Sequence, residues 1–242
     1  MNTQVSLQGK TALITGATGG IGKAIAVRLA QKGMHLILIG KTTEKLTVLK
    51  KELEKIAVTT YIYEVDLSKP EDVLKQLAVI GKKHTIDVLI HCAGVIKSSF
   101  VEESAIDDFE YQHKVNLSAP VIMTIKLLPV IIKAKGQIVF INSSVINNPK
   151  AGTSFYAAAK AGLKAFADGL RAEVNKQGIR VISIFPGTTA TSLQENLAEQ
   201  LKKKYYAKLL LQPEDIAEIT VTALEIPLTA EVTDVFLRPF HK

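Results

Sequence analysis

The sequence predicts a three-layer α/β fold, in which one doubly wound parallel sheet is covered by helices on both faces. Short apolar runs alternate with longer helical patterns along the whole chain. Repeated units of strand and helix require right-handed crossovers, and these produce a parallel sheet buried on both sides. The 242 residues, 47% of them hydrophobic, suit one domain with a sizeable core. With no internal repeat or linker, we expect a single domain over residues 1–242.

The expected elements follow one another in regular alternation. Strands are predicted at residues 11–15, 35–39, 60–65, 88–93, 137–142, 181–185 and 232–237. Helical patterns fill most of the gaps; Pro70 after Ser68 marks one helix start, and two aspartates at 107–108 mark another. Residues 191–211 form the one insertion-like segment, and their amphipathic pattern suits a mobile flap over a substrate.

Composition excludes several classes of protein. The single cysteine, Cys92, excludes an internal disulfide and a cysteine-cluster metal site, and the five histidines lack metal-ligand spacing, so we expect no metal. No apolar run approaches 20 residues, and residues 1–8 lack the features of a secretory signal, which predicts a cytoplasmic protein without a membrane partner. The net charge of +7 is spread along helices without interleaved aromatics, so we expect a small-molecule substrate and no nucleic acid.

Residues 15–22 form a glycine-rich turn between the first strand and the first helix. Glycines here permit a tight turn whose backbone can approach a pyrophosphate at the positive end of a helix. This order of strand, turn and helix is typical of a dinucleotide-binding Rossmann fold. The cofactor-binding residues expected in the turn are Gly16, Thr18, Gly19, Gly20, Ile21 and Gly22.

Tyr156 and Lys160 are four positions apart on one helix face. A lysine ammonium at that distance favours the phenolate, so the phenol could release its proton well below the usual pKa of about 10. Ser143 and Ser144 end the preceding strand, where a hydroxyl can hydrogen-bond a substrate carbonyl oxygen. Asn116 lies in a helical stretch, although asparagine has a low helix propensity. Each residue alone has an ordinary structural explanation, but together they indicate carbonyl reduction.

With these residues in place, the chain resembles the short-chain dehydrogenase/reductase family over essentially its whole length. The matching motifs are the turn at 15–22, Asp66-Leu67, Ala93-Gly94, Asn116, the serine, Tyr156 with Lys160, and Pro186-Gly187 with Thr191. In that family serine, tyrosine, lysine and asparagine form a catalytic tetrad, and the asparagine holds a water that links the lysine to a proton relay. The resemblance implies Asn116, Ser144, Tyr156 and Lys160 in these roles.

The choice of serine stays open between Ser143 and Ser144. Ser144 is preferred because it precedes Val145 and Ile146, which fits the family's pattern of a serine before apolar residues if the following loop is one residue shorter.

The resemblance also implies the remaining cofactor contacts. Asp66 and Leu67 would flank the adenine, Ala93 and Gly94 would let the backbone approach the cofactor, and Lys160 would hold the nicotinamide ribose beside Tyr156. The carboxamide would be held by Pro186, Gly187, Thr189 and Thr191.

One departure from the family pattern concerns the residues after the fourth strand. His91 and Cys92 stand where the family often has two asparagines. We expect them to be packing substitutes and not a reactive pair.

The end of the second strand predicts the cofactor. An acid there would bind the ribose 2′-hydroxyl of NAD(H), but this chain has Lys41, which favours NADP(H). The alternative is that Lys41 only begins the exposed face of the next helix.

The resemblance implies an NADP(H)-dependent carbonyl reductase or alcohol dehydrogenase. Residues 235–240 resemble relatives that act on small hydroxy acids, aldehydes or ketones. The enzymatic alternative is a 3-oxoacyl-thioester (acyl carrier protein) reductase. A non-catalytic NADP(H)-binding regulator is the alternative from another class.

The helix that carries Tyr156 has more apolar surface than one packed face needs. A stripe of about 100° is enough to pack a helix on a sheet, whereas here small and apolar residues spread further. They are Ala157, Ala158, Ala161, Gly162, Ala165, Phe166, Ala167 and Leu170. The surplus predicts that a symmetric copy packs on this helix, in a homodimer or homotetramer.

Overall fold

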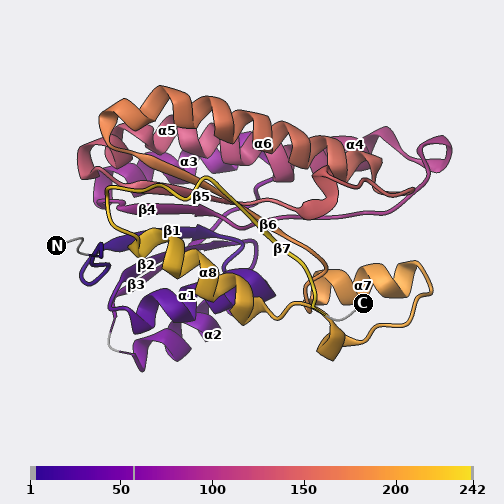
Figure 1. The fold of residues 1–242 in the computed structure, drawn as a ribbon, viewed down its shortest axis with the longest axis horizontal. Helices are drawn as coiled ribbons and strands as arrows, with labels where there is room; N and C mark the ends of the chain where they lie inside the picture. The colour runs from indigo at the N-terminus through magenta and orange to yellow at the C-terminus, as the bar shows by residue number, and fades with distance from the viewer. Residues whose placement is uncertain (1–3, 57, 241–242) are drawn as a thin grey trace.

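The computed structural model describes residues 4–56 and 58–240; residues 1–3, at the start of the segment tested for a secretory signal, lie outside this part. Within it, seven parallel strands form one sheet in the order β3-β2-β1-β4-β5-β6-β7 (Figure 1). The strands are β1 (Thr11–Thr15), β2 (His35–Gly40), β3 (Thr60–Glu64), β4 (Val88–His91), β5 (Gln137–Ile141), β6 (Arg180–Pro186) and β7 (Asp234–Leu237). The predicted doubly wound parallel sheet is confirmed, with strand ends shifted by at most two residues.

Helices cover both faces of this sheet (Figure 1). One face carries α1 (Gly20–Gln31), α2 (Thr43–Glu54) and α8 (Pro213–Glu225), and the other carries α3 (Pro70–Lys83), α4 (Ile106–His113), α5 (Ala119–Ala134) and α6 (Ser154–Val174). Successive side chains of a strand point to opposite faces. Ala12 and Ile14 therefore join the core beneath α1 and α8, while Leu13 joins the core beneath α5 and α6. Burial on both faces explains why the five inner strands read as continuous apolar runs. The edge strands β3 and β7 are only partly buried.

The direction of winding reverses between β1 and β4. The chain builds outward from β1 through β2 to β3, then crosses back to place β4 on the other side of β1. Thr15 consequently lies between Ile39 and His91 at the carboxyl end of the sheet. Such a reversal leaves a crevice outside the strand ends, where α/β folds bind their ligands. The remaining helix, α7 (Ser192–Gln200), lies beyond these strand ends (Figure 1).

One helical stretch departs from the expectation that no segment could span a membrane. The π-helical turn η2 (Lys114–Ser118) joins α4 and α5 into a stretch, Ile106–Ala134, that is long and apolar enough to cross a membrane by length and composition. In this fold α5 packs beside α3 over the sheet, and its inner residues Met123, Leu127 and Ile131 are buried there. The inner side of α5 is therefore part of the core, whereas Ile106 on α4 and Ile125 on α5 are exposed.

A buried arginine completes the end of α8. The last carbonyl groups of a helix have no partner inside the helix. Arg180 of β6, only 8% exposed, donates from Nη1 to the carbonyl oxygens of Ile226 (2.9 Å) and Ala230 (3.3 Å), and from Nη2 to that of Leu224 (3.0 Å). This side chain thus ties α8 and the following loop to the sheet.

We expect Arg180→Met to lower the free energy of unfolding by about 3 kcal/mol, because it leaves several carbonyl groups without a charged donor. Arg28→Met is the matched control, since Arg28 forms an exposed pair with Glu218 and should cost less than about 1 kcal/mol. Urea unfolding of both variants measures the difference. Equal losses would show that Arg180 contributes no more than a surface ion pair.

Candidate active site

The glycine-rich turn has room for backbone only. Gly16 adopts a φ of +64°, and a Cβ there would lie 2.6 Å from the Cα of Ala93. A Cβ on Gly22 would lie 2.2 Å from the carbonyl oxygen of Gly16. The first helical residue of α1 is Gly20, and its N-cap Gly19 has no side chain to satisfy the free N–H groups. Those groups and the helix dipole fit a pyrophosphate, so the residues present suit a dinucleotide.

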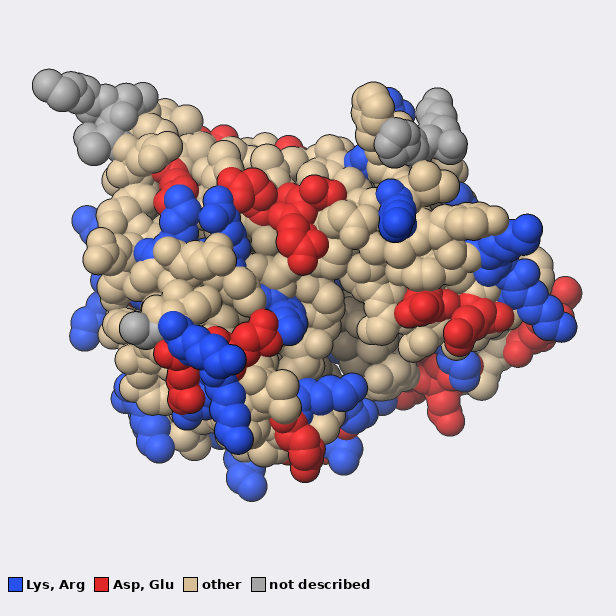
Figure 2. All heavy atoms as spheres, turned by 90° about the horizontal axis from the view of Figure 1, so that it is seen from below, with Lys and Arg blue, Asp and Glu red and all other residues tan. Residues whose placement is uncertain are grey.

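A cleft opens from this turn along the carboxyl ends of β1 and β4. Figure 2 shows a hollow in this face of the molecule, between the part that carries α1 and α2 and the part that carries α7. Most of the cofactor-binding residues expected from the sequence line the cleft: Gly16, Thr18, Gly19, Gly20, Ile21, Gly22, Lys41, Asp66, Leu67, Ala93, Gly94, Tyr156, Lys160 and Thr191. Residues distant in the sequence are thus brought to one site.

Of the four residues expected to hold the carboxamide after β6, only Thr191 lines the cleft. Thr191 caps α7, where its Oγ1 accepts from the backbone N–H of Gln194 at 3.3 Å, and it also lines the cleft. Pro186 ends β6, the Gly187 N–H donates to the carbonyl of Leu237, and Thr189 donates back to the carbonyl of Gly187. These three residues shape the strand end outside the cleft lining, so their expected contact with a carboxamide stays a prediction.

Asn116 is buried inside the π-helical turn. Its Oδ1 accepts from the backbone N–H of Val95 at 3.0 Å, and its Nδ2 donates to the carbonyl of Val95 at 2.8 Å. A π turn inserts one extra residue into a helix and is often found at functional sites. The side chain of Asn116 clamps the loop after β4, next to Gly94, and this explains a polar residue within a helix. Its expected link to a relay water stays a prediction.

Lys160 is buried at the centre of the site. Its Nζ donates to the carbonyl oxygen of Ile141 at 3.0 Å and lies 5.8 Å from the ring centroid of Tyr156. Burial lowers the pKa of Lys160 to about 8, because the charged amine is separated from water.

The pKa of Tyr156 departs from the sequence-based expectation. Enclosure of its phenol raises the pKa, and a hydrogen bond with Ser143 acts in the opposite direction. The expected lowering of the Tyr156 pKa is wrong for this geometry, since burial of the phenol is the leading cause and raises the pKa, and the Lys160 amine is directed to Ile141. The phenol thus keeps its proton near neutral pH.

The geometry favours Ser143 over Ser144 as the serine of the site. The Ser143 side chain hydrogen-bonds that of Tyr156 and accepts from the N–H of Val145 at 3.2 Å. Ser143 is thereby the N-cap of the short 3-10 turn Ser144–Ile146. Ser144 begins that turn, and its side chain shows no such bond within the described part of the chain. Because the contact with Tyr156 crosses a loop, the sequence held no signal for it, and the choice of serine stays a prediction.

His91 and Cys92 pack without charge, as expected. The His91 ring stacks on Phe140 with centroids 4.9 Å apart, and its Nε2 lies 3.0 Å from the Thr124 hydroxyl. Burial, followed by the nearby charge of Lys160, lowers the pKa of His91 to about 3. Burial raises the pKa of the Cys92 thiol to about 12. Neither group is suited to acid–base or nucleophilic chemistry at neutral pH.

Several residues of the cleft lining were not predicted as site residues from the sequence. Among them are Val95 after β4, Tyr111 on α4 and Leu193 on α7. Tyr111 is one helical turn before Val115, another residue of the cleft lining, so their shared helix face could have indicated it. Lys41 lies near Tyr111 in the cleft: its Nζ is 3.1 Å from Asp66 Oδ2 and 6.0 Å from the centre of the Tyr111 ring.

Comparison with known proteins identifies the family of this chain. The short chain dehydrogenase family model matches residues 10–202. An uncharacterized oxidoreductase of Staphylococcus saprophyticus is 32% identical over 97% of this chain and 99% of its own. The 3-oxoacyl-[acyl-carrier-protein] reductase of Aquifex aeolicus is 31% identical over 96% of this chain and 98% of its own. L-sorbose reductase of Gluconobacter frateurii, solved with NADPH and L-sorbose, has a TM-score of 0.88 at 26% identity, covering 96% of this chain and 97% of that chain.

This chain belongs to the short-chain dehydrogenase family. It is an oxidoreductase that acts on CH–OH groups and binds a nicotinamide dinucleotide.

Removing the buried amine should stabilise the protein. Lys160 has a folded pKa of about 8 against 10.5 for a free lysine, so burial of its charge costs on the order of 3 kcal/mol near pH 7. We expect Lys160→Met to recover part of this cost, less the lost bond to Ile141.

The gain in the free energy of unfolding should be largest below pH 8 and should shrink as the pH rises toward 10.5. Between these two pH values the unfolded wild type binds more protons than the folded wild type, so the stability of the wild type rises with pH. Urea unfolding of both proteins at pH 7, 8.5 and 10, without cofactor, measures it. A destabilised Lys160→Met at pH 7 would contradict the expectation.

Proposed function

We propose that this protein is an NADP(H)-dependent carbonyl reductase or alcohol dehydrogenase, which transfers a hydride between nicotinamide and a carbonyl or secondary alcohol substrate. The observation that carries the proposal is the hydroxyl pair of Ser143 and Tyr156 beside the buried amine of Lys160. Tyr156 and Lys160 line a cleft that begins in a glycine cradle suited to a dinucleotide, and Ser143 follows Asn142, another residue of the lining.

The bound cofactor supplies the hydride, and the residues of the chain handle the oxygen atom and the proton. The hydroxyl groups of Ser143 and Tyr156 donate to the substrate carbonyl oxygen and stabilise the negative charge that develops there. Tyr156 then transfers its proton to that oxygen, which yields the alcohol. The raised pKa of Tyr156 keeps the proton in place until it is needed, and the cationic form of Lys160 stabilises the phenolate that remains. Oxidation runs through the same groups in reverse.

The preference for NADP(H) is supported by Lys41 at the carboxyl end of β2. A lysine there offers a positive charge to a 2′-phosphate, and it occupies the position directly after β2 where an acid would bind a 2′-hydroxyl. The solved L-sorbose reductase, which resembles this chain, was obtained with NADPH.

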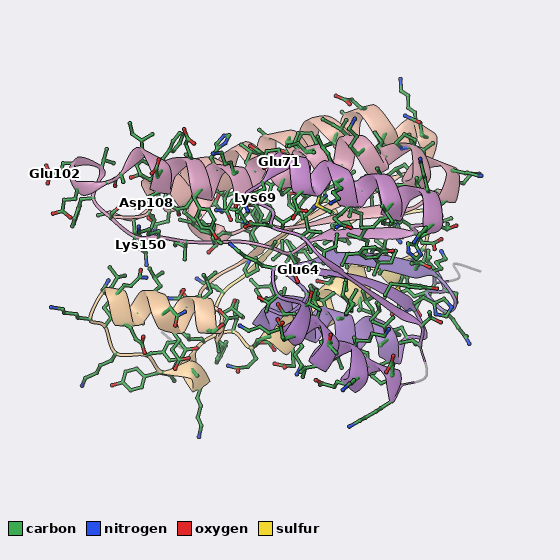
Figure 3. The ribbon with its side chains drawn as sticks, turned by 180° about the vertical axis from the view of Figure 1, so that it is seen from behind. Glu64, Lys69, Glu71, Glu102, Asp108 and Lys150 are labelled. Atoms are coloured by element: carbon green, nitrogen blue, oxygen red, sulfur yellow. The ribbon has the colours of Figure 1, made fainter. Side chains whose placement is uncertain are left out.

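Two substrate classes remain candidates, a small ketone or aldehyde and a 3-oxoacyl thioester. The resemblance to an acyl-carrier-protein reductase favours the thioester, and basic residues near the cleft would suit an acidic carrier. Lys202, Lys203 and Lys204 are exposed after α7, and Figure 3 shows Lys150 on the loop after β5, opposite α7. The segment 191–211 would act as the flap over either substrate, since Ser192 and Leu193 already line the cleft.

A panel of small ketones and an acetoacetyl thioester, assayed with NADPH and NADH, tests these proposals. Turnover of the thioester alone would select the second class. Tight NADPH binding without any turnover would support the non-catalytic regulator instead.

We place the enzyme in the cytoplasm, in keeping with its free Cys92 thiol.

Tyr156→Phe should lower kcat by at least roughly 10²-fold, because it removes the proton donor and keeps the ring. NADPH affinity, measured by fluorescence titration, should stay close to that of the wild type. Near-native turnover would show that another group donates the proton.

Ser143→Ala and Ser144→Ala form a matched pair that tests the choice of serine. We expect Ser143→Ala to lower kcat by roughly 10²-fold, since it removes a donor to the developing oxyanion. Ser144→Ala should retain most of the wild-type kcat. The reverse order would restore the sequence-based preference for Ser144.

We also propose that two copies associate through α5 and α6. Four small residues lie on the outer face of α6: Ala158, Ala161 and Ala165 are exposed, and no atom lies within 4 Å of a Cβ placed on Gly169. On the neighbouring α5, Ile125 is 59% exposed. Small residues let two helices approach closely, and a twofold axis would place the same face on both partners. Such a partner would cover the apolar outer face of the stretch Ile106–Ala134.

Ala165→Glu should disrupt this association, because it places a charge at the centre of the shared face. Val48→Glu is the control, since Val48 is 67% exposed on α2, on the opposite side of the sheet. Light scattering gives the masses of both variants. A monomeric, fully active wild type would rule out the association.

A further inference from the structure

Lys41 is held within the adenosine end of the cleft by two partners. Its Nζ lies 3.1 Å from Oδ2 of Asp66, in the loop after β3, and 6.0 Å from the ring centroid of Tyr111 on α4. The other carboxylate oxygen of Asp66 accepts from the backbone N–H and the hydroxyl of Ser68, at 3.0 and 2.7 Å. Asp66 is therefore fixed in place with Oδ2 presented to Lys41.

The ion pair between Lys41 and Asp66 can be exchanged. The Lys41 side chain is 64% exposed, and exposed ion pairs are weak because water and salt compete with them. Burial alone would raise the pKa of Asp66, but hydrogen bonds from Ser68 and Lys41 hold it below its usual value, so the carboxylate is charged at neutral pH. Lys41 thus has a full negative charge beside it before any ligand arrives.

The other acid at this edge of the sheet is engaged elsewhere. Glu64 ends β3, opposite Gly40 in the register, and accepts from the backbone N–H and the hydroxyl of Thr43 at the start of α2. Its carboxylate forms no ion pair with Lys41 in the part of the chain that the structure describes. Asp66 is the acid that holds the lysine.

We propose that Asp66 and the 2′-phosphate of NADP(H) compete for Lys41, so that binding of this phosphate exchanges one ion pair for another. The inference rests on the proposed NADP(H) dependence. A phosphate monoester carries more negative charge than a carboxylate and has more acceptor oxygens, so the exchange is favourable. A cofactor without the 2′-phosphate leaves Lys41 on Asp66. The preference for NADP(H) is then set by the difference in free energy between the pair of Lys41 with the 2′-phosphate and the pair of Lys41 with Asp66. Asp66 therefore limits this preference.

Calorimetric titration with cofactor fragments tests the exchange without turnover. The ligands are adenosine 2′,5′-bisphosphate and adenosine 5′-monophosphate, and the proteins are the wild type, Asp66→Asn, Lys41→Met and the double variant. Asparagine keeps an oxygen for Ser68 but releases Lys41. Because Asp66 is expected to flank the adenine that both ligands carry, the quantity that tests the exchange is the ratio of bisphosphate affinity to monophosphate affinity. We expect Asp66→Asn to raise this ratio by roughly two- to fivefold, the range of an exposed ion pair. In the Lys41→Met background the same change should not raise this ratio.

Glu64→Gln is the control for general electrostatics, since it removes one negative charge from the same edge without touching Lys41. The effect of Glu64→Gln on bisphosphate affinity should be the same in the wild type and in the Lys41→Met background. The competition is overturned if Asp66→Asn does not raise the ratio of bisphosphate affinity to monophosphate affinity, or if it changes this ratio equally in both Lys41 backgrounds. Wild-type binding of the bisphosphate and NADPH would then leave the proposed function standing, whereas failure of the wild type to bind either ligand would overturn both proposals.

Discussion

A lysine amine buried at the carboxyl end of the sheet is the constraint around which the active site is arranged. The bond from Lys160 to the carbonyl of Ile141 sets α6 against the end of β5. Tyr156, one turn earlier on α6, therefore meets Ser143, which follows the same strand. A cation in this environment is costly, and its presence adds to burial in keeping His91 neutral. Burying the Lys160 cation therefore lowers the stability of the fold, but it places a positive charge beside Tyr156.

The two lysines of the cleft show how burial changes the role of one residue type. Lys160 is almost fully buried, and its pKa falls to about 8. Lys41 is largely exposed, and its hydrogen bond with Asp66 is the leading cause that raises its pKa. A buried amine with few degrees of freedom can position a proton, whereas an exposed one can change partners at low cost. One end of the cleft is thus rigid, and the other is adaptable.

Much of the fold followed from local patterns. The five inner strands are buried on both faces and must be apolar throughout, so their runs were visible in the sequence. The turn from Gly16 to Gly22 was equally legible, because a close approach of backbone to backbone admits only glycine at its tightest points. Tyr156 and Lys160 were readable from helical spacing alone, since both lie on one face of α6.

Contacts between distant segments were decided only by the tertiary structure. The sequence could not choose between Ser143 and Ser144, because the choice depends on which hydroxyl meets Tyr156 across a loop. Nor could it show that Asp66 holds Lys41, as these residues follow neighbouring strands whose loops meet only once the sheet has formed. Periodicity reports how a segment is buried, so the sequence by itself determined the strands, the glycine cradle and the tyrosine–lysine pair. Hydrogen-bond partners and pKa values depend on groups that folding brings together from distant parts of the chain, and these the tertiary structure decided.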